Sequence, residues 1–242
     1  MTRERDRPAI SGVFITGTDT GVGKTRIGTT LAHCLAQRGV CVRARKPVES
    51  GCPRGENGLR PQDAAALHAA ARSAEPLERV CRYCLEAALS PERAAALEGL
   101  ALDLEQLLAA CRAGVREDDF LLVEGAGGFY SPLAPGVLNA DLAAALGLPV
   151  LLVAADRLGA INHTLLTVRA IERHGLKLAG LVLNEAAPVT DPRMDNAADL
   201  ERWLARPVTR VPHRPLSGSG ARAWVDLAPY LETLAERLLV RQ

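Results

Sequence analysis

The stretch GTDTGVGKT, from Gly17 to Thr25, ends in Gly-Lys-Thr, as a phosphate-binding loop does. The general spacing of that loop, G-x-x-x-x-G-K-[ST], requires a glycine where this chain has Thr18. The loop also needs backbone N–H groups that point inward at the start of a helix, and Gly21 and Gly23 allow the necessary backbone conformations. We therefore interpret the stretch as a nucleotide-binding loop; the alternative is a glycine-rich turn with a surface lysine.

Two side chains of this loop would carry its chemistry. Lys24 can reach the β- and γ-phosphates of a nucleotide, and the hydroxyl of Thr25 can ligate Mg²⁺. An apolar run precedes the loop and an amphipathic pattern follows it. The loop therefore lies between a predicted strand and a predicted helix, which is the context that a phosphate site requires.

Short apolar runs rich in β-forming residues alternate with longer Ala/Leu-rich stretches along the whole chain. This alternation predicts an α/β fold: a parallel sheet with helices on both faces. Runs such as LLVE and VLLVAA are apolar throughout, as strands buried on both faces should be. The runs begin at Gly12, Val40, Phe120, Pro149, Leu178 and Pro207, and helical patterns include residues 25–37, 104–111, 165–174 and 227–239.

The length and composition narrow the possible functions. A chain of 242 residues fits one α/β domain, so we expect residues 1–242 to form a single domain, with residues 52–100 as loop and helices inserted in it. The net charge of +1 and the 3% aromatic content give no footprint for nucleic acid. With no apolar run of 18 residues and no secretory signal, we expect no membrane segment and a cytoplasmic location.

Six cysteines are present, and we expect free thiols rather than disulfides. Cys81 and Cys84, in CRYC, have the spacing of metal ligands or a redox pair. The chain offers no second pair with that spacing and no well-spaced histidines. We therefore favour small, partly buried residues at these positions.

Glycines and polar residues follow the predicted strands. KPVESG follows the second strand, EGAGG the third and DRLGAINHT the fourth, while Asn184 ends the fifth. In open parallel sheets ligands bind at the carboxyl ends of the strands. This pattern therefore predicts a ligand site at that edge of the sheet, independently of the loop.

Two charged residues at these strand ends are candidates for the chemistry. Glu124 closes FLLVE, and a carboxylate after buried apolar residues needs a cation or hydrogen bonds; the small residues of GAGG leave room for a ligand and for backbone N–H donors. Lys46 would face the γ-phosphate and stabilise charge during phosphoryl transfer. A solvent-exposed glutamate and a solvated basic strand end are the alternatives.

Four motifs, taken in order, resemble the dethiobiotin synthetase family: GTDTGVGKT, KPVESG, VEGAGGFYSPL and RLGAINHTLLT. The resemblance runs from about Gly12 to Asn184. The family's loop has the form GTDT-x-VGKT, so the threonine at position 18 is a family feature. The resemblance implies a P-loop NTPase-like fold of the MinD-like branch and a homodimer whose sites are shared at the interface.

The resemblance also implies a reaction. Such an enzyme uses ATP and Mg²⁺ to join CO₂ to 7,8-diaminopelargonic acid, through a carbamate and a carbamic–phosphoric anhydride, and releases dethiobiotin, ADP and phosphate. It is an ATP-dependent cyclo-ligase that forms C–N bonds in biotin synthesis.

The family's functional residues carry over by motif. Lys46 and Lys24 are the implied catalytic residues, and Thr25, Asp63 and Glu124 the implied Mg²⁺ ligands, although Asp63 alone would be interpreted as a helix-start acid. The implied cofactor-binding residues are Gly21, Val22, Gly23, Lys24, Thr25, Arg26, Asp63, Glu124, Gly125, Ala126, Gly127, Asn184, Glu185, Val211, Pro212 and His213, and the implied substrate-binding residues are Ser50, Gly128, Gly159 and Asn162.

The last two of these are implied to serve the partner subunit's substrate, whose carboxylate could bind N–H groups at a helix start. The alternative is that Asn162 caps its helix. The chain departs from the family at Gly21, where some members have glutamate, and after Val211 and Pro212. The preference among nucleotides therefore does not follow from the resemblance.

A partitioning or positioning ATPase of the same fold is the alternative function. Such ATPases carry a lysine early in the loop, where this chain has Asp19. Their basic membrane helix is also missing from the sequence, because LETLAERLLVRQ reads as an amphipathic core-packing helix. A related amide-forming synthetase would need an ammonia-producing domain, for which the chain has no room.

Overall fold

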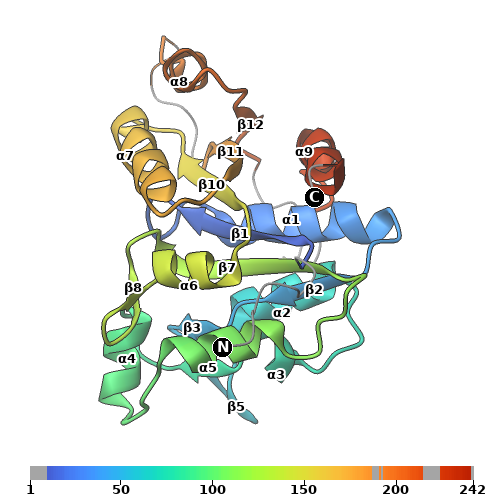
Figure 1. Ribbon diagram of the computed structural model, residues 1–242, viewed down its shortest axis with the longest axis vertical. Helices are drawn as coiled ribbons and strands as arrows, with labels where there is room; N and C mark the ends of the chain where they lie inside the picture. The colour runs from blue at the N-terminus through green and yellow to red at the C-terminus, as the bar shows by residue number, and fades with distance from the viewer. Residues whose placement is uncertain (1–9, 187–190, 192, 215–223, 241–242) are drawn as a thin grey trace, which may run out of the picture.

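A six-stranded parallel sheet forms the centre of the molecule, in the order β12-β11-β10-β1-β7-β2 (Figure 1). The computed structural model describes residues 10–186, 191, 193–214 and 224–240. All six predicted runs are strands of this sheet. Their bounds are β1 Gly12–Gly17, β2 Val42–Arg45, β7 Phe120–Gly128, β10 Val150–Ala155, β11 Leu178–Asn184 and β12 Thr209–Val211.

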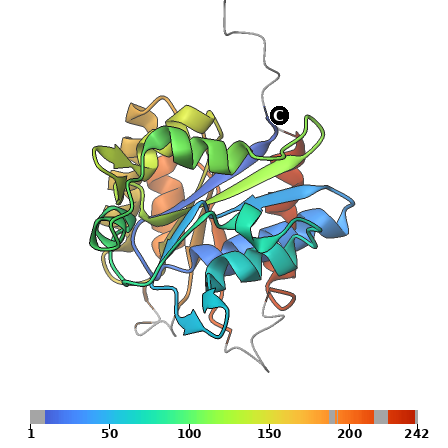
Figure 2. The same cartoon turned by 90° about the horizontal axis from the view of Figure 1, so that it is seen from below.

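Helices cover both faces of the sheet, as the alternation predicts (Figure 2). Successive strand residues point to opposite faces, so Val13 and Ile15 of β1 pack with one group of helices and Phe14 packs with the other. The first group is α1 Lys24–Gln37, α2 Gln62–Ala70 and α9 Ala228–Val240. The second is α5 Leu104–Arg112, α6 Asn139–Leu146, α7 Ala160–Arg173 and α8 Asn196–Leu204.

The predicted helices are confirmed, with one difference in extent. α7 begins at Ala160 rather than near Leu165, because its first turn contains polar residues that hide the apolar periodicity. Gly159 precedes it with φ 90°, in the left-handed region that favours glycine. The stretch of residues 215–223, which the sequence marks by its Gly and Ser content, lies outside the described residues.

The inserted region of residues 52–100 and the segment just before it contain more strand than we predict from the sequence. A short parallel pair joins β3 Val48–Ser50 to β6 Tyr83–Leu85. These strands have three residues each, too few for a period-two pattern to stand out. The other elements are β4 Arg54–Gly55, β5 Gly58–Leu59, α3 Leu77–Val80 and α4 Pro91–Leu97, and β8 Pro132–Ala134 pairs with β9 Val137–Leu138 beyond β7.

The six cysteines are free thiols, as predicted. Cys81 is buried and Cys84 partly buried, and their sulfur atoms lie 3.6 Å apart. Among the described residues no group of three His, Cys, Asp or Glu side chains is arranged to hold a metal ion. None of the described helices is both long enough and apolar enough to cross a bilayer.

Candidate nucleotide and metal site

The loop after β1 has the backbone geometry of a phosphate site. Gly21 and Gly23 have φ of 75° and 98°, and α1 begins directly afterwards at Lys24. Gly23 is also tightly packed, because an added Cβ would lie 2.2 Å from Nδ2 of Asn184. Glycine is therefore required there for both conformation and space. The loop places its N–H groups at the N-terminus of a helix, where an anion is favoured.

The structure explains why the chain tolerates threonine at position 18. Among the described non-glycine residues a positive φ occurs at Arg72 and Ala205, so Thr18 has an ordinary φ. The Thr18 N–H donates to the carbonyl oxygen of Val153 at 3.0 Å, which continues the β1–β10 pairing by one residue. The position that has no room for a side chain is Gly17, since an added Cβ there would lie 2.7 Å from Cγ2 of Val22.

Lys24 is held inside the loop. Its Nζ donates to the carbonyl oxygen of Asp19 at 2.9 Å, and its side chain is buried. Burial lowers the pKa of Lys24 to about 8, while the nearby carboxylate of Glu124 acts in the opposite direction. A bound phosphate would favour the charged form of Lys24, so binding of an anion would raise the pKa of this lysine.

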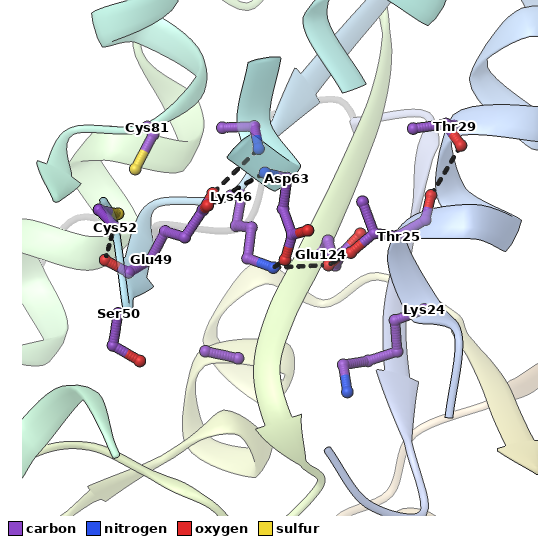
Figure 3. Close-up of polar contacts among 12 residues, drawn as sticks. Lys24, Thr25, Thr29, Lys46, Glu49, Ser50, Cys52, Asp63, Cys81 and Glu124 are labelled. Carbon is purple, nitrogen blue, oxygen red and sulfur yellow. Dashed lines mark hydrogen bonds and ion pairs between the residues drawn. The ribbon is translucent and has the colours of Figure 1, made fainter. Parts of the chain in front are cut away.

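Four side chains from four segments meet next to the loop (Figure 3). Nζ of Lys46 donates to Oε1 of Glu124 at 2.7 Å and also to the carboxylate of Asp63. The hydroxyl of Thr25 donates to the same Oε1 at 2.7 Å. Burial opposes the charge on Lys46, but the two carboxylates raise its pKa above the ordinary value. The interpretation of Lys46 as a solvated strand end is therefore wrong.

Glu124 is buried, with 1% of its surface exposed, so the interpretation as a solvent-exposed glutamate is also wrong. The prediction that Glu124 ends its strand is wrong, because β7 continues to Gly128. The register with β1 shifts just after the Ile15–Glu124 pair, so Glu124 is the last regularly paired residue before the glycines. Its Oε2 is buried and accepts no hydrogen bond from any residue that the structure describes.

Asn139 supports the GAGG segment from the start of α6, a role that no sequence pattern indicates. Its Nδ2 donates to the carbonyl oxygens of Ala126 and Gly128, at 2.6 and 2.9 Å. Its Oδ1 accepts from the N–H of Ala126, and the hydroxyl of Ser131 accepts from the N–H of Gly128. Two of the N–H groups that we expect to face a ligand are therefore already satisfied within the protein.

A cavity of about 280 Å³ joins these groups. It lies at the carboxyl edge of the sheet, as predicted. A cavity of about 990 Å³ lies at the opposite edge, near the amino ends of β1, β10 and β11, and contains none of the predicted residues. The smaller cavity is lined by Thr20, Gly21, Gly23, Lys24, Thr25, Lys46, Glu49, Ser50, Asp63, Glu124, Ala126 and Gly127.

Residues predicted to contact the nucleotide base gather at the ends of β11 and β12. Nδ2 of Asn184 donates to the carbonyl oxygen of Val22 at 2.9 Å, which ties β11 to the phosphate loop. Its Oδ1 is buried and has no hydrogen-bond partner within the described chain. The backbone N–H of His213 donates to Oε2 of Glu185 at 3.0 Å. Arg26 reaches the next segment, where Nη2 donates to the carbonyl oxygen of Arg214.

The predicted substrate residues divide between two places. Ser50 lines the cavity, and its hydroxyl donates to the carbonyl oxygen of Leu89 at 2.6 Å. Gly159 and Asn162 do not line it; they lie at the start of α7. The N-cap position of α7 belongs to Gly159, so the alternative that Asn162 is the capping residue is wrong.

Glu49 is a second residue that the sequence did not single out, although it lies within KPVESG. Its carboxylate accepts hydrogen bonds from the backbone N–H groups of Asp63 and Ala64, at 3.0 and 2.9 Å. Burial raises the pKa of Glu49, and the charge of Lys46 opposes that shift.

Comparison of the fold with solved structures gives MinD cell division proteins. MinD of Aquifex aeolicus matches 96% of this chain and 98% of its own, with a TM-score of 0.54 and 16% identity. The MinC:MinD complex of the same organism matches with a TM-score of 0.54 and 15% identity, over 96% of both chains. These likenesses concern the fold alone, and they agree with the predicted MinD-like branch of P-loop folds.

Comparison of the sequence identifies much nearer relatives. A family model described as "AAA domain" matches residues 11–219. The ATP-dependent dethiobiotin synthetase BioD of Anaeromyxobacter dehalogenans (strain 2CP-C) is 45% identical over 88% of this chain and 94% of its own. That of Cellvibrio japonicus (strain Ueda107) is 43% identical over 90% and 97%. At this identity and coverage, with the loop, the lysine and the carboxylates brought together in one cavity, the chain belongs to the ATP-dependent dethiobiotin synthetase family.

Proposed function

We propose that this protein is an ATP-dependent dethiobiotin synthetase. It joins CO₂ to 7,8-diaminopelargonic acid and closes the ureido ring, with release of ADP and phosphate. The observation that carries the proposal is the meeting of Lys46 with Glu124 and Asp63 beside the phosphate loop. A phosphoryl-transfer site needs this combination of fixed positive charge and hard oxygen ligands.

The phosphate loop binds and orients the nucleotide. Backbone N–H groups at the start of α1 and the ammonium of Lys24 face the phosphates. Asn184 fixes the loop through Val22, and its Oδ1, which has no partner among the described residues, can accept from a donor on the base. The backbone of residues 211–213 closes the base end with Glu185.

The residues present fit Mg²⁺. Glu124 has a buried oxygen, Oε2, without a donor in the described chain. Its other oxygen, Oε1, accepts from the hydroxyl of Thr25 and shares Lys46 with the carboxylate of Asp63, so both residues add oxygen atoms to the same cluster. Two carboxylates, a hydroxyl and nucleotide phosphates are a typical ligand set for this hard cation. When bound, Mg²⁺ would neutralise charge on the phosphates.

Lys46 is the residue that we assign to the chemistry. Its ammonium is buried and fixed between Glu124 and Asp63, at the wall of the cavity that also holds Ser50. From there it can stabilise a carbamate oxygen and the transferring phosphoryl group, where negative charge develops. The second amine of the substrate then displaces phosphate and closes the ring, while Ser50 helps to orient the substrate.

The proposal includes a homodimer with shared sites. Leu158, at the start of the segment leading into α7, is 93% exposed, and Leu166 on α7 is also exposed. A protein contact would remove these apolar side chains from water, which is favourable. Asn162 lies between them on the exposed side of the same helix start. The N–H groups there can receive the substrate carboxylate from a partner subunit.

A mixed dimer tests the sharing. One subunit carries Lys46→Gln and the other carries Gly159→Pro with Asn162→Ala, and we expect each change to inactivate its own homodimer. The mixed dimer should regain part of the activity, because one of its two sites combines two intact halves. Verified heterodimers without any activity would show that each site is built from one chain.

We further propose that the chain is a single domain, acts in the cytoplasm and has no nucleic-acid or membrane partner. The main test is a turnover assay with the diamine, bicarbonate and MgATP. Release of phosphate should require the diamine, and dethiobiotin should form in equal amount. Equal ATP hydrolysis without the diamine would instead favour a nucleotide-switched ATPase, and parallel assays with other nucleotides would define the base preference.

A further inference from the structure

Glu49 holds the start of α2 from outside the helix (Figure 3). Its side chain is buried, and its two carboxylate oxygens each accept one backbone N–H. Oε1 accepts from Asp63 at 3.0 Å and Oε2 from Ala64 at 2.9 Å. Both oxygens are therefore committed to the protein backbone, which suits an anchoring role better than direct contact with a ligand.

Helices α2 and α5 differ in how their N-termini are capped. Both helices have nine residues. In α5 one N–H of the first turn is satisfied locally, since the side chain of the N-cap residue Asp103 accepts from the N–H of Gln106 at 2.8 Å. The N-cap of α2 is Pro61, which has no polar side chain. Glu49, in strand β3, instead accepts from two N–H groups in the first turn of α2. The cap of α2 thus depends on β3.

This arrangement ties two functional residues to one short segment. Asp63 stands in the first turn of α2, and one of the two N–H groups that Glu49 binds is its own. Lys46, three residues before Glu49, binds the Asp63 carboxylate. The segment from Lys46 to Glu49 therefore holds Asp63 at both its backbone and its side chain. A carboxylate fixed in this way loses little freedom when it ligates a cation.

We propose that Glu49 is a positioning residue that fixes Asp63 for metal binding, an inference that rests on the proposed function because that function makes Asp63 a Mg²⁺ ligand. Glu49 acts through the backbone of α2 and contacts neither metal nor nucleotide. Loss of such an outer partner typically costs about tenfold or more in metal affinity.

The test measures Mn²⁺ binding by electron paramagnetic resonance, with the non-hydrolysable β,γ-imido analogue of ATP present. Glu49→Ala should raise the dissociation constant of Mn²⁺ by about tenfold. Glu49→Gln, which keeps the volume and one acceptor, should give a smaller rise and carries the test if the alanine variant does not fold. Asp103→Ala removes the cap of α5, a helix of the same length that does not line the cavity, and should leave Mn²⁺ binding at the wild-type value.

A double-mutant cycle with Asp63→Asn completes the experiment. If Glu49 acts through Asp63, then Glu49→Ala should add little to Asp63→Asn. Full additivity, or an equal loss of Mn²⁺ affinity in Asp103→Ala, would overturn the positioning role while the metal role of Asp63 stands. Wild-type Mn²⁺ binding by Glu49→Ala, with weakened binding by Asp63→Asn, would overturn it too. Wild-type binding by Asp63→Asn would remove the metal assignment itself, and this inference with it.

Discussion

The phosphate end of the candidate site, formed by Lys24, Thr25, Lys46, Asp63 and Glu124, is held together differently from the base end, formed by Asn184, Glu185 and residues 211–213. At the phosphate end, charged side chains from separate segments bind one another directly. At the base end, the contacts run mainly from single side chains to the backbone. Charge chemistry restricts residue types far more than backbone recognition does.

The largest expected effect lies at the phosphate end. Lys46→Gln should lower kcat by about a hundredfold or more, because it removes a fixed cation from the transferring phosphoryl group. Binding of MgATP should remain close to wild type, since Lys24 and the loop are intact. Steady-state kinetics and nucleotide titration measure the two effects separately.

Lys177→Gln is the matched control, because this exposed lysine lies at the amino end of β11, on the other side of the molecule. It should behave as wild type in both measurements. Normal turnover by Lys46→Gln would exclude Lys46 from the mechanism and leave the ion pairs with Glu124 and Asp63 a structural role only.

Removal of one carboxylate charge should have the next largest effect. Glu124→Gln and Asp63→Asn should each raise the Mg²⁺ concentration for half-maximal activity by roughly tenfold or more, since the cation prefers charged oxygen ligands. Glu124→Gln should be the more severe, because Glu124 is buried and contacts both Thr25 and Lys46. The KM for the diamine should change little.

A Mg²⁺ titration at saturating ATP measures this prediction. Curves that superimpose on wild type would refute both ligand assignments. A change confined to the KM for the diamine would place these carboxylates at the substrate rather than at the metal, and would weaken the contrast between the two ends of the site.

At the base end a single amide should matter less. Asn184→Ala removes the donor to the buried carbonyl oxygen of Val22, a loss typically worth about 1–3 kcal/mol. We expect ATP affinity to fall by about tenfold, with kcat at saturating ATP nearly unchanged, as measured by titration with ATP. Asn196→Ala removes another buried amide, which donates to Asp156 and to the carbonyl oxygen of Arg157, and should lower stability without changing ATP affinity. A large loss of kcat in Asn184→Ala would show that the two ends are not separable.

The same contrast explains how much the sequence could predict. The strands, the loop and the side chains of Thr25, Lys46 and Glu124 follow from apolar periodicity, from glycines and from charge beside buried runs. Asp63 follows only from the family resemblance. The supporting roles of Glu49 and Asn139 could not be predicted from the sequence. Each binds backbone groups of a segment more than ten residues away, and a backbone partner leaves no mark on the sequence.

The short β3–β6 pair was missed for a related reason. Three-residue strands depend on their neighbours for stability, so their local pattern is weak. The start of α7 shows the opposite case. There Gly159 marks the boundary clearly, but the polar first turn conceals the helix that follows.

The smallest expected effect concerns Thr18, where the chain departs from the general loop motif. Thr18 has an ordinary φ and donates its backbone N–H to Val153, a contact that glycine can also make. Thr18→Gly should therefore leave the KM for ATP within about twofold of wild type. It should lower the free energy of unfolding by about 0.4–1 kcal/mol, because glycine gives the unfolded chain more freedom.

Gly23→Ala is the contrasting variant. The added Cβ would collide with Asn184 at a φ of 98°, so the substitution should impair ATP binding severely. Urea unfolding and ATP kinetics on both variants measure this difference. If Thr18→Gly bound ATP much more tightly than wild type, the threonine would be restraining the loop, and the glycine of the general motif would contribute directly to phosphate binding.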